Sequence, residues 1–246
     1  MARRSPGLFL CASALFLCFS SGCSAGKRRV LEIPEGLTGV IAYGSLISLT
    51  SMEQTLGHKY EGPVHEGHLR GWGRVWTCVR PFNEPQAIAA GSPKMEAHFL
   101  RDGERVPVIG AAELNVFPKK TGRINGILYL ITEKDLLKLD KRERGYRRAD
   151  VSGDIEEFRF SAGKVFVYEG LPVSPVAASV EKGTYVLIKE FRDSVTGACD
   201  LRGKSFRDEF DRSTKPCDFP VLSYKDIVWE PIMQILFVSK RAGNAG

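Results

Sequence analysis

The sequence predicts an α+β domain in which a small mixed β-barrel is flanked by a few helices. Short runs of aromatic and β-branched residues, such as residues 75–79, recur between clusters of turn residues, and this pattern is typical of strands. Only three short segments carry helix-start signals or one-faced apolar periodicity. Many strands with few helices favour this class over a helical bundle or a doubly wound fold.

The predicted strands are apolar runs bounded by Gly, Pro, Asn, Asp or Ser. They cover, in order, residues 39–43, a strand-rich region at 62–117 with a hairpin turn at Asp102-Gly103, and residues 124–131, 147–151, 157–161, 164–169 and 227–238. The Asp-Gly pair suits a two-residue hairpin because both residues tolerate positive φ.

Three helices are predicted. The first covers residues 50–57 and begins with Thr50-Ser51-Met52-Glu53, a capping-box pattern. The second begins after Thr132, whose hydroxyl can accept from the first turn, and ends around Glu143. The third covers residues 185–194, whose apolar side chains share one face.

Composition excludes several classes of protein. The 246 residues are 43% hydrophobic and 26% charged, as in an average folded domain. The 35 Lys+Arg and 29 Asp+Glu residues give a net charge of +6, and the two signs are interleaved, so we expect no nucleic-acid partner. Residues 27–246 are predicted to form one domain with a C-terminal helical and strand extension from about residue 171.

Residues 1–26 are predicted to be an export signal. Two arginines precede an apolar run at residues 8–19, and small residues follow. The run is shorter than the roughly 20 residues that a spanning helix needs. Small residues before Cys23 resemble a lipobox, so we expect a lipoprotein acylated at Cys23, anchored in a membrane and facing the periplasm or cell surface. Cleavage near Ala25, giving a secreted soluble protein, is the alternative.

Removal of the signal, with or without acylation of Cys23, leaves three thiols in the mature chain: Cys78, Cys199 and Cys217. In an oxidising compartment Cys199 and Cys217 could be bridged or remain as two thiols. The cysteine spacing does not fit a zinc site, and His65 and His68 would face opposite sides of a strand. We therefore expect no metal.

Two segments far apart in the chain carry the candidate chemistry. Tyr43-Gly44-Ser45-Leu46 follows the first strand directly, and a glycine there lets successive amides point into a cavity, which suits a carboxylate or a developing oxyanion. The second segment, residues 139–148, places Glu143 at a helix end with Tyr146 close behind. Taken alone, the first segment favours an ordinary turn and the second a solvated, salt-bridged turn.

The second segment also leaves the protonation of Glu143 open. Arginines that surround its carboxylate would hold it ionised, whereas arginines that point to solvent would let burial raise its pKa. The four arginines concerned are Arg142, Arg144, Arg147 and Arg148. A further internal carboxylate, Glu113, is expected on the outer face of its strand, and Tyr146 is expected to pack.

In order and spacing the two segments resemble the γ-glutamylcyclotransferase-like superfamily. Residues 42–47 look like the opening of its ChaC-type branch, whereas Leu139-Asp140 before the glutamate is closer to its other branches. The resemblance covers roughly residues 38–169. It implies a small β-barrel flanked by helices, with a cavity for a small γ-glutamyl substrate and with no cofactor or metal.

The resemblance also implies a role for each matching residue. The backbone amides around Tyr43, Gly44, Ser45 and Leu46 would bind the γ-glutamyl portion, and Glu143 would be the catalytic acid/base. The substrate's α-amine would attack its own γ-carbonyl and give 5-oxoproline and a released amine. Two alternatives stay open: a lipid-anchored binding module without turnover, and a structural envelope lipoprotein in which no pocket joins the two segments.

Overall fold

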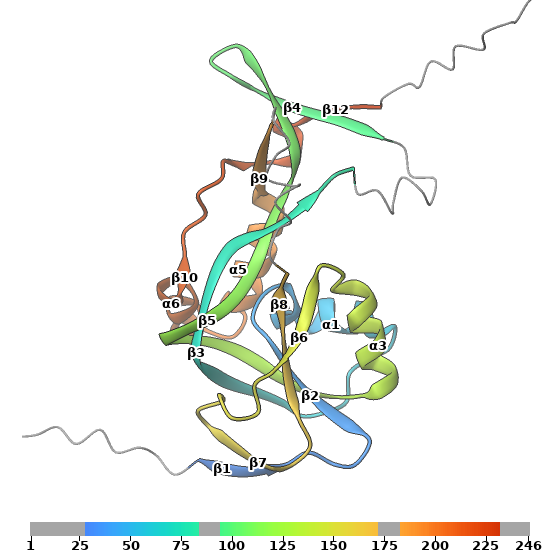
Figure 1. Cartoon of the computed structure of the whole chain (residues 1–246), viewed down its shortest axis with the longest axis vertical. Coiled ribbons are helices and arrows are strands. Elements are labelled where there is room, and N and C mark those ends of the chain that lie inside the picture. Colours follow the sequence, from blue (N-terminus) through green and yellow to red (C-terminus); the bar gives the residue numbers. More distant parts are fainter. Residues whose placement is uncertain (1–27, 84–93, 172–182, 232–246) are drawn as a thin grey trace, which may run out of the picture.

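The computed structural model describes residues 28–83, 94–171 and 183–231 (Figure 1). Twelve strands and four α-helices in these residues make a mixed α+β fold, so the predicted class is confirmed. The helices are α1 (Leu49–Leu56), α3 (Glu133–Arg142), α5 (Lys189–Asp200) and α6 (Lys204–Ser213), with 3-10 turns η1 (Ser45–Ile47) and η2 (Tyr224–Asp226). None of the helices in the described ranges is long and apolar enough to cross a membrane.

Ten of the strands form one mixed sheet, and β1 and β7 pair separately. The strands are β1 (Arg29–Glu32), β2 (Leu37–Ala42), β3 (Val64–Pro81), β4 (Met95–Arg101), β5 (Glu104–Thr132), β6 (Tyr146–Asp150), β7 (Phe158–Ala162), β8 (Val165–Gly170), β9 (Thr184–Ile188), β10 (Thr214–Lys215), β11 (Val221–Leu222) and β12 (Val228–Pro231). The main path runs β10-β3-β5-β2-β8-β6.

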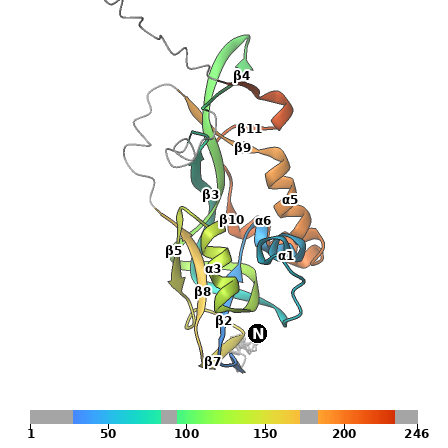
Figure 2. The same ribbon diagram turned by 90° about the vertical axis from the view of Figure 1, so that its right-hand side faces the viewer.

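Strand β5 organises the whole sheet. It pairs antiparallel with β2, β3 and β4 and parallel with β9. Its residues 124–131 are buried throughout, whereas burial alternates along residues 108–116. A strand covered on both faces is apolar throughout, and a strand covered on one face alternates. The part of the β3–β5 ladder that contains residues 108–116 is therefore covered on one face. Beyond it the ladder continues toward β4 and β12 (Figures 1 and 2).

The predicted elements near the candidate site are confirmed. Strand β2 matches predicted residues 39–43, and α3 begins where the Thr132 hydroxyl accepts from the Asp135 amide at 3.2 Å. The hairpin between β4 and β5 turns at Asp102-Gly103, with φ of 52° and 84°. The short strands after α3 also match the prediction within a residue or two.

Two helix predictions need correction. The first helix begins earlier, because the Ser48 side chain accepts from the Ser51 amide and caps Leu49–Leu56. Residues 185–188, predicted as the first part of a helix, belong to strand β9 (Thr184–Ile188), and α5 begins only at Lys189. Val186, Leu187 and Ile188 are almost fully buried where β9 pairs with β5, so tertiary pairing decides the conformation of this apolar run.

Cys199 and Cys217 are free thiols, so a bridge between them is not formed. Cys199 is fully buried in α5, while the Cys217 thiol faces the Trp76 carbonyl at 3.9 Å. Several predictions fall outside the described residues: the export signal with Cys23, most of the segment at 171–182, and residues 232–238 of the predicted last strand.

A candidate active-site pocket

The turn after β2 forms one wall of a small pocket. Strand β2 ends at Ala42, and η1 begins at Ser45 after Gly44, with the Ile47 amide donating to the Gly44 carbonyl at 2.9 Å. The first amides of a helical turn have no acceptor within that turn. Gly44, Ser45 and Leu46 all line the pocket. This wall can therefore offer backbone N–H groups to a bound anion.

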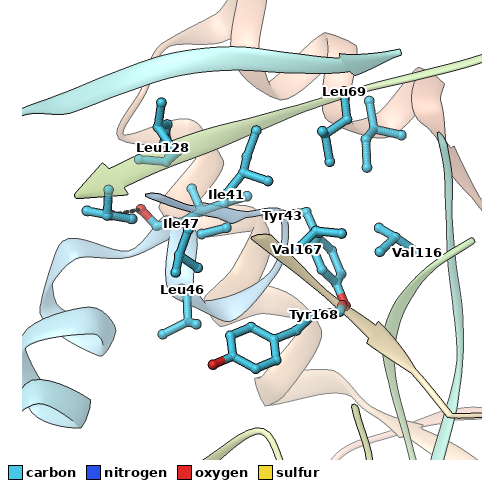
Figure 3. Close-up of a cluster of buried hydrophobic side chains, with 14 of the residues drawn as sticks. Ile41, Tyr43, Leu46, Ile47, Leu69, Val116, Leu128, Val167 and Tyr168 are labelled. Atoms are coloured by element: carbon cyan, nitrogen blue, oxygen red, sulfur yellow. Dashed lines mark hydrogen bonds between the residues drawn. The ribbon is translucent and has the colours of Figure 1, made fainter. Parts of the chain in front are cut away.

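The Tyr43 side chain belongs to the core beneath that wall. It is buried, and its hydroxyl donates to the Tyr168 carbonyl at 2.6 Å. Figure 3 shows its ring beside Val167 and Tyr168, near Leu46 and Ile47. Burial, reinforced by the nearby Glu143 carboxylate, raises the pKa of Tyr43 well above its usual value. Its neutral phenol therefore anchors β2 against β8.

Glu143 belongs to a second wall of the pocket, at the end of α3. Its amide donates to the Leu139 carbonyl at 2.8 Å and closes the last helical turn. The Tyr146 amide then donates to the Glu143 carbonyl at 3.0 Å, and Gly145 makes the reversal into β6 with φ of 97°, where glycine is favoured. The Glu143 side chain is 15% exposed and lines the pocket.

Arg142 connects the two walls directly. Its Nε lies 3.2 Å from Glu143 Oε1, and its Nη2 donates to Ser45 Oγ at 3.0 Å. The same guanidinium donates to the Ser51 hydroxyl and carbonyl and to the Thr55 hydroxyl on α1. One side chain thus holds the two segments that the sequence singled out on the same pocket.

Only one of the four arginines touches Glu143. Arg147 pairs with Glu169 at 2.9 Å and Arg148 with Asp140 at 3.3 Å, while Arg144 is exposed. Burial raises the pKa of the Glu143 carboxyl, Arg142 opposes this, and the Glu113 carboxylate adds to it. Burial prevails, which favours a carboxyl able to exchange protons closer to neutral pH.

Several pocket residues that could contact a ligand were not predicted as site residues. Glu113 lies on the pocket side of β5 and not on an outer face, and it pairs with Arg80 at 2.9 Å. The Tyr146 hydroxyl donates to the Leu114 carbonyl at 2.7 Å, and Phe191 of α5 lines the same pocket. The sequence signal for Glu113 was its place inside an apolar strand, where a carboxylate is costly unless paired.

The pocket is small and chemically mixed. Its volume is about 220 Å³, below the range of roughly 300–1,000 Å³ typical of sites for drug-sized ligands. Two carboxylates and two guanidinium groups face it, beside a wall of backbone amides. They belong to Glu113, Glu143, Arg80 and Arg142. Such a pocket can bind a small zwitterion and move a proton on it.

A group with metal-ligand side chains lies elsewhere. Ligand atoms of His68, Glu156 and Glu157 come within 4.8 Å of one another. The two nitrogens of His68 already contact Glu157 and Glu209, and Arg123 pairs with Glu156 at 2.7 Å. The positive charge beside the Glu156 carboxylate thus comes from a protein side chain, Arg123.

Comparisons with known proteins give structural likenesses but no family. No family model and no curated protein matches the chain. The structure is similar to YkqA from Bacillus subtilis, with 16% identity over 72% of this chain and 54% of that chain, at a TM-score of 0.42. This chain thus spans about half the length of that one.

Two other solved structures are covered almost completely. One is a gamma-glutamyl cyclotransferase, with 9% identity over 76% of this chain and 93% of that chain, at a TM-score of 0.46. The other is an uncharacterized protein from Homo sapiens, with 12% identity over 77% and 94%, at a TM-score of 0.41. No activity follows for this chain from likenesses at that level.

Proposed function

We propose that this pocket binds the γ-glutamyl group of a peptide or amine and cyclises it to 5-oxoproline, with release of the amine. The observation that carries the proposal is the Arg142 bridge, 3.0 Å from Ser45 Oγ and 3.2 Å from Glu143 Oε1. It brings a wall of backbone amides and a buried carboxyl to one small cavity. The resemblance of both segments to γ-glutamylcyclotransferases supports the same reaction.

The reaction needs one group that first removes and then returns a proton. The substrate's α-amine is protonated near neutral pH, and Glu143 takes a proton from it so that the nitrogen can attack the γ-carbonyl. A ring C–N bond forms, and the carbonyl oxygen becomes an oxyanion facing the amides of residues 44–46. The original amide C–N bond then breaks as Glu143 returns this proton to the leaving nitrogen, and the ring nitrogen passes its second proton to the released amine.

The remaining pocket groups suit the substrate's ends. A γ-glutamyl group carries an α-amine and an α-carboxylate, and the pocket offers both carboxylates and guanidinium groups. The cavity of about 220 Å³ is small, in keeping with a ligand group of a few heavy atoms. Holding the nucleophile near the carbonyl contributes part of the roughly 7–11 kcal/mol that orientation can supply.

The decisive experiment incubates residues 27–246 with a panel of γ-glutamyl peptides and amines and measures 5-oxoproline. Release from at least one compound supports the enzyme. Binding of these compounds without release would favour the lipid-anchored binding module. Neither binding nor release would favour the structural lipoprotein and would end the proposal.

The pH dependence of the reaction should follow Glu143. Because the base form starts the reaction, kcat/KM should rise with pH through the raised pKa of this carboxyl. Arg142 lowers that pKa, so Arg142→Gln should move the acid limb of the profile to higher pH. Arg144→Gln, an exposed neighbour, should leave the limb in place. An unmoved limb in Arg142→Gln would contradict the assignment of the limb to Glu143.

We also propose that the chain is exported and acylated at Cys23. We expect Cys23→Ala, or globomycin treatment of the wild type, to change the mobility of the mature protein and release it from membranes. Cys18→Ala, within the apolar run, is the matched control and should behave as the wild type. If mobility and membrane partition are unchanged under both treatments, the result would favour a secreted, unlipidated protein over acylation at Cys23.

A further inference from the structure

A buried arginine lies directly behind the amide wall of the pocket. Arg74 of β3 is 1% exposed, and its guanidinium plane packs 3.9 Å from the Phe210 ring centroid. Its five N–H groups contact six oxygens, so one N–H is shared; these oxygens belong to the turn after β2, to β5, to the end of α6 and to β10. The acceptors are the carbonyls of Tyr43 (3.1 Å), Asn125 (3.0 Å) and Phe210 (3.3 Å), Asn125 Oδ1 (2.8 Å), Ser213 Oγ (2.8 Å) and Thr214 Oγ1 (2.8 Å).

All six acceptors are uncharged, so hydrogen bonds satisfy this cation but do not neutralise it. In the part of the chain that the structure describes, Arg74 forms no ion pair within 4.0 Å. Burial lowers the pKa of Arg74 to about 9, which still leaves it protonated at neutral pH. A charge in a region of low dielectric acts on its surroundings more strongly than a charge in water.

The contact with Tyr43 sets the direction of the next amide. In a trans peptide the carbonyl and the following N–H point in opposite directions. Arg74 binds the Tyr43 carbonyl from inside the protein, and Gly44 and Ser45 line the pocket. Fixing this carbonyl on Arg74 therefore directs the Gly44 N–H the opposite way within the peptide plane, away from Arg74.

We propose that Arg74 is a positioning residue for the pocket, which orients the Tyr43–Gly44 peptide and makes the amide wall electropositive toward a developing oxyanion. This inference rests on the proposed cyclisation. It assigns an electrostatic role to a residue that does not touch the substrate. Pre-oriented dipoles in a site shielded from water are a large source of transition-state stabilisation.

Asn125→Asp tests the charge with a side chain of the same size, although it also loses the hydrogen bond that Asn125 Nδ2 donates to the Phe206 carbonyl at 2.8 Å. The new carboxylate would lie where Oδ1 now accepts from Arg74 at 2.8 Å, so the hydrogen bond remains and the charge is neutralised. With the full chain we expect kcat for 5-oxoproline release to fall at least about tenfold, with KM changed much less. Ser213→Ala, which removes one uncharged acceptor, should keep kcat within about twofold of the wild type.

The outcomes separate this inference from the function on which it rests. An inactive wild-type chain would end the proposed function. An active wild type with an unchanged kcat in folded Asn125→Asp would overturn the role of Arg74 alone. If Asn125→Asp does not fold, Arg74→Gln decides, because it removes both the charge and the guanidinium contact with the Tyr43 carbonyl. We expect kcat to fall at least about tenfold, and an unchanged kcat in the folded variant overturns the role of Arg74.

Discussion

Replacement of Glu143 by glutamine should abolish 5-oxoproline release while leaving the fold intact. The amide keeps the size of the side chain but can neither take the proton of the α-amine nor return it to the leaving amine. Positioned acid–base groups are worth about 10²–10⁴-fold, so a loss of kcat on that scale is expected. Affinity for a γ-glutamyl compound, measured by calorimetry, should change little, because the main contact that we propose is with backbone amides.

Glu133→Gln is the matched control for this variant. It makes the same change at the other end of α3, where Glu133 is exposed. We expect wild-type kcat and wild-type thermal stability. Should Glu143→Gln release 5-oxoproline at the wild-type rate while folded, Glu143 is not the acid/base and the enzyme as proposed is excluded.

The parts of the site that sequence could predict are those with local signals. The turn follows an apolar strand and contains Gly44, and α3 is bounded by Thr132 and by the glycine that reverses the chain after Glu143. Each feature depends on residues within a few positions of it. The two segments could be joined only by a resemblance, since nothing local brings residues a hundred positions apart to one cavity.

The parts that sequence could not predict arise from long-range strand pairing. Arg80 and Glu113 meet because β3 and β5 are paired, and the register of that pairing shifts between Trp76 and Cys78. A bulge moves every later side chain to the other face of its strand. Alternation read from the sequence therefore cannot decide whether Glu113 faces solvent or pocket.

The same limit explains the error at residues 185–188. Their apolar spacing fits a helical face, but the run is aromatic and β-branched and lies beside β5. The parallel pairing with residues 108–111 fixes it as a strand. The chain then enters α5, whose Phe191 reaches the pocket. The C-terminal extension thus supplies part of the candidate site. No local sequence motif predicted this contribution.

Leu139→Ala should produce a large loss of stability. Leu139 is fully buried on the inner face of α3, in the core that also contains residues of β2 and β5. Deleting a buried leucine side chain costs about 2–5 kcal/mol, because apolar contact is lost and a cavity remains. Domains of this kind have about 5–15 kcal/mol in total, so the urea midpoint should fall clearly.

Leu137→Ala is the control on the same helix. Leu137 is 63% exposed, so its truncation removes little packing, and alanine favours helix slightly more than leucine. We expect a change within about 0.5 kcal/mol. Equal losses in the two variants would contradict the orientation of α3. Since that orientation turns the helix end toward Ser45, it would also remove the bridge through Arg142 on which the proposed site depends.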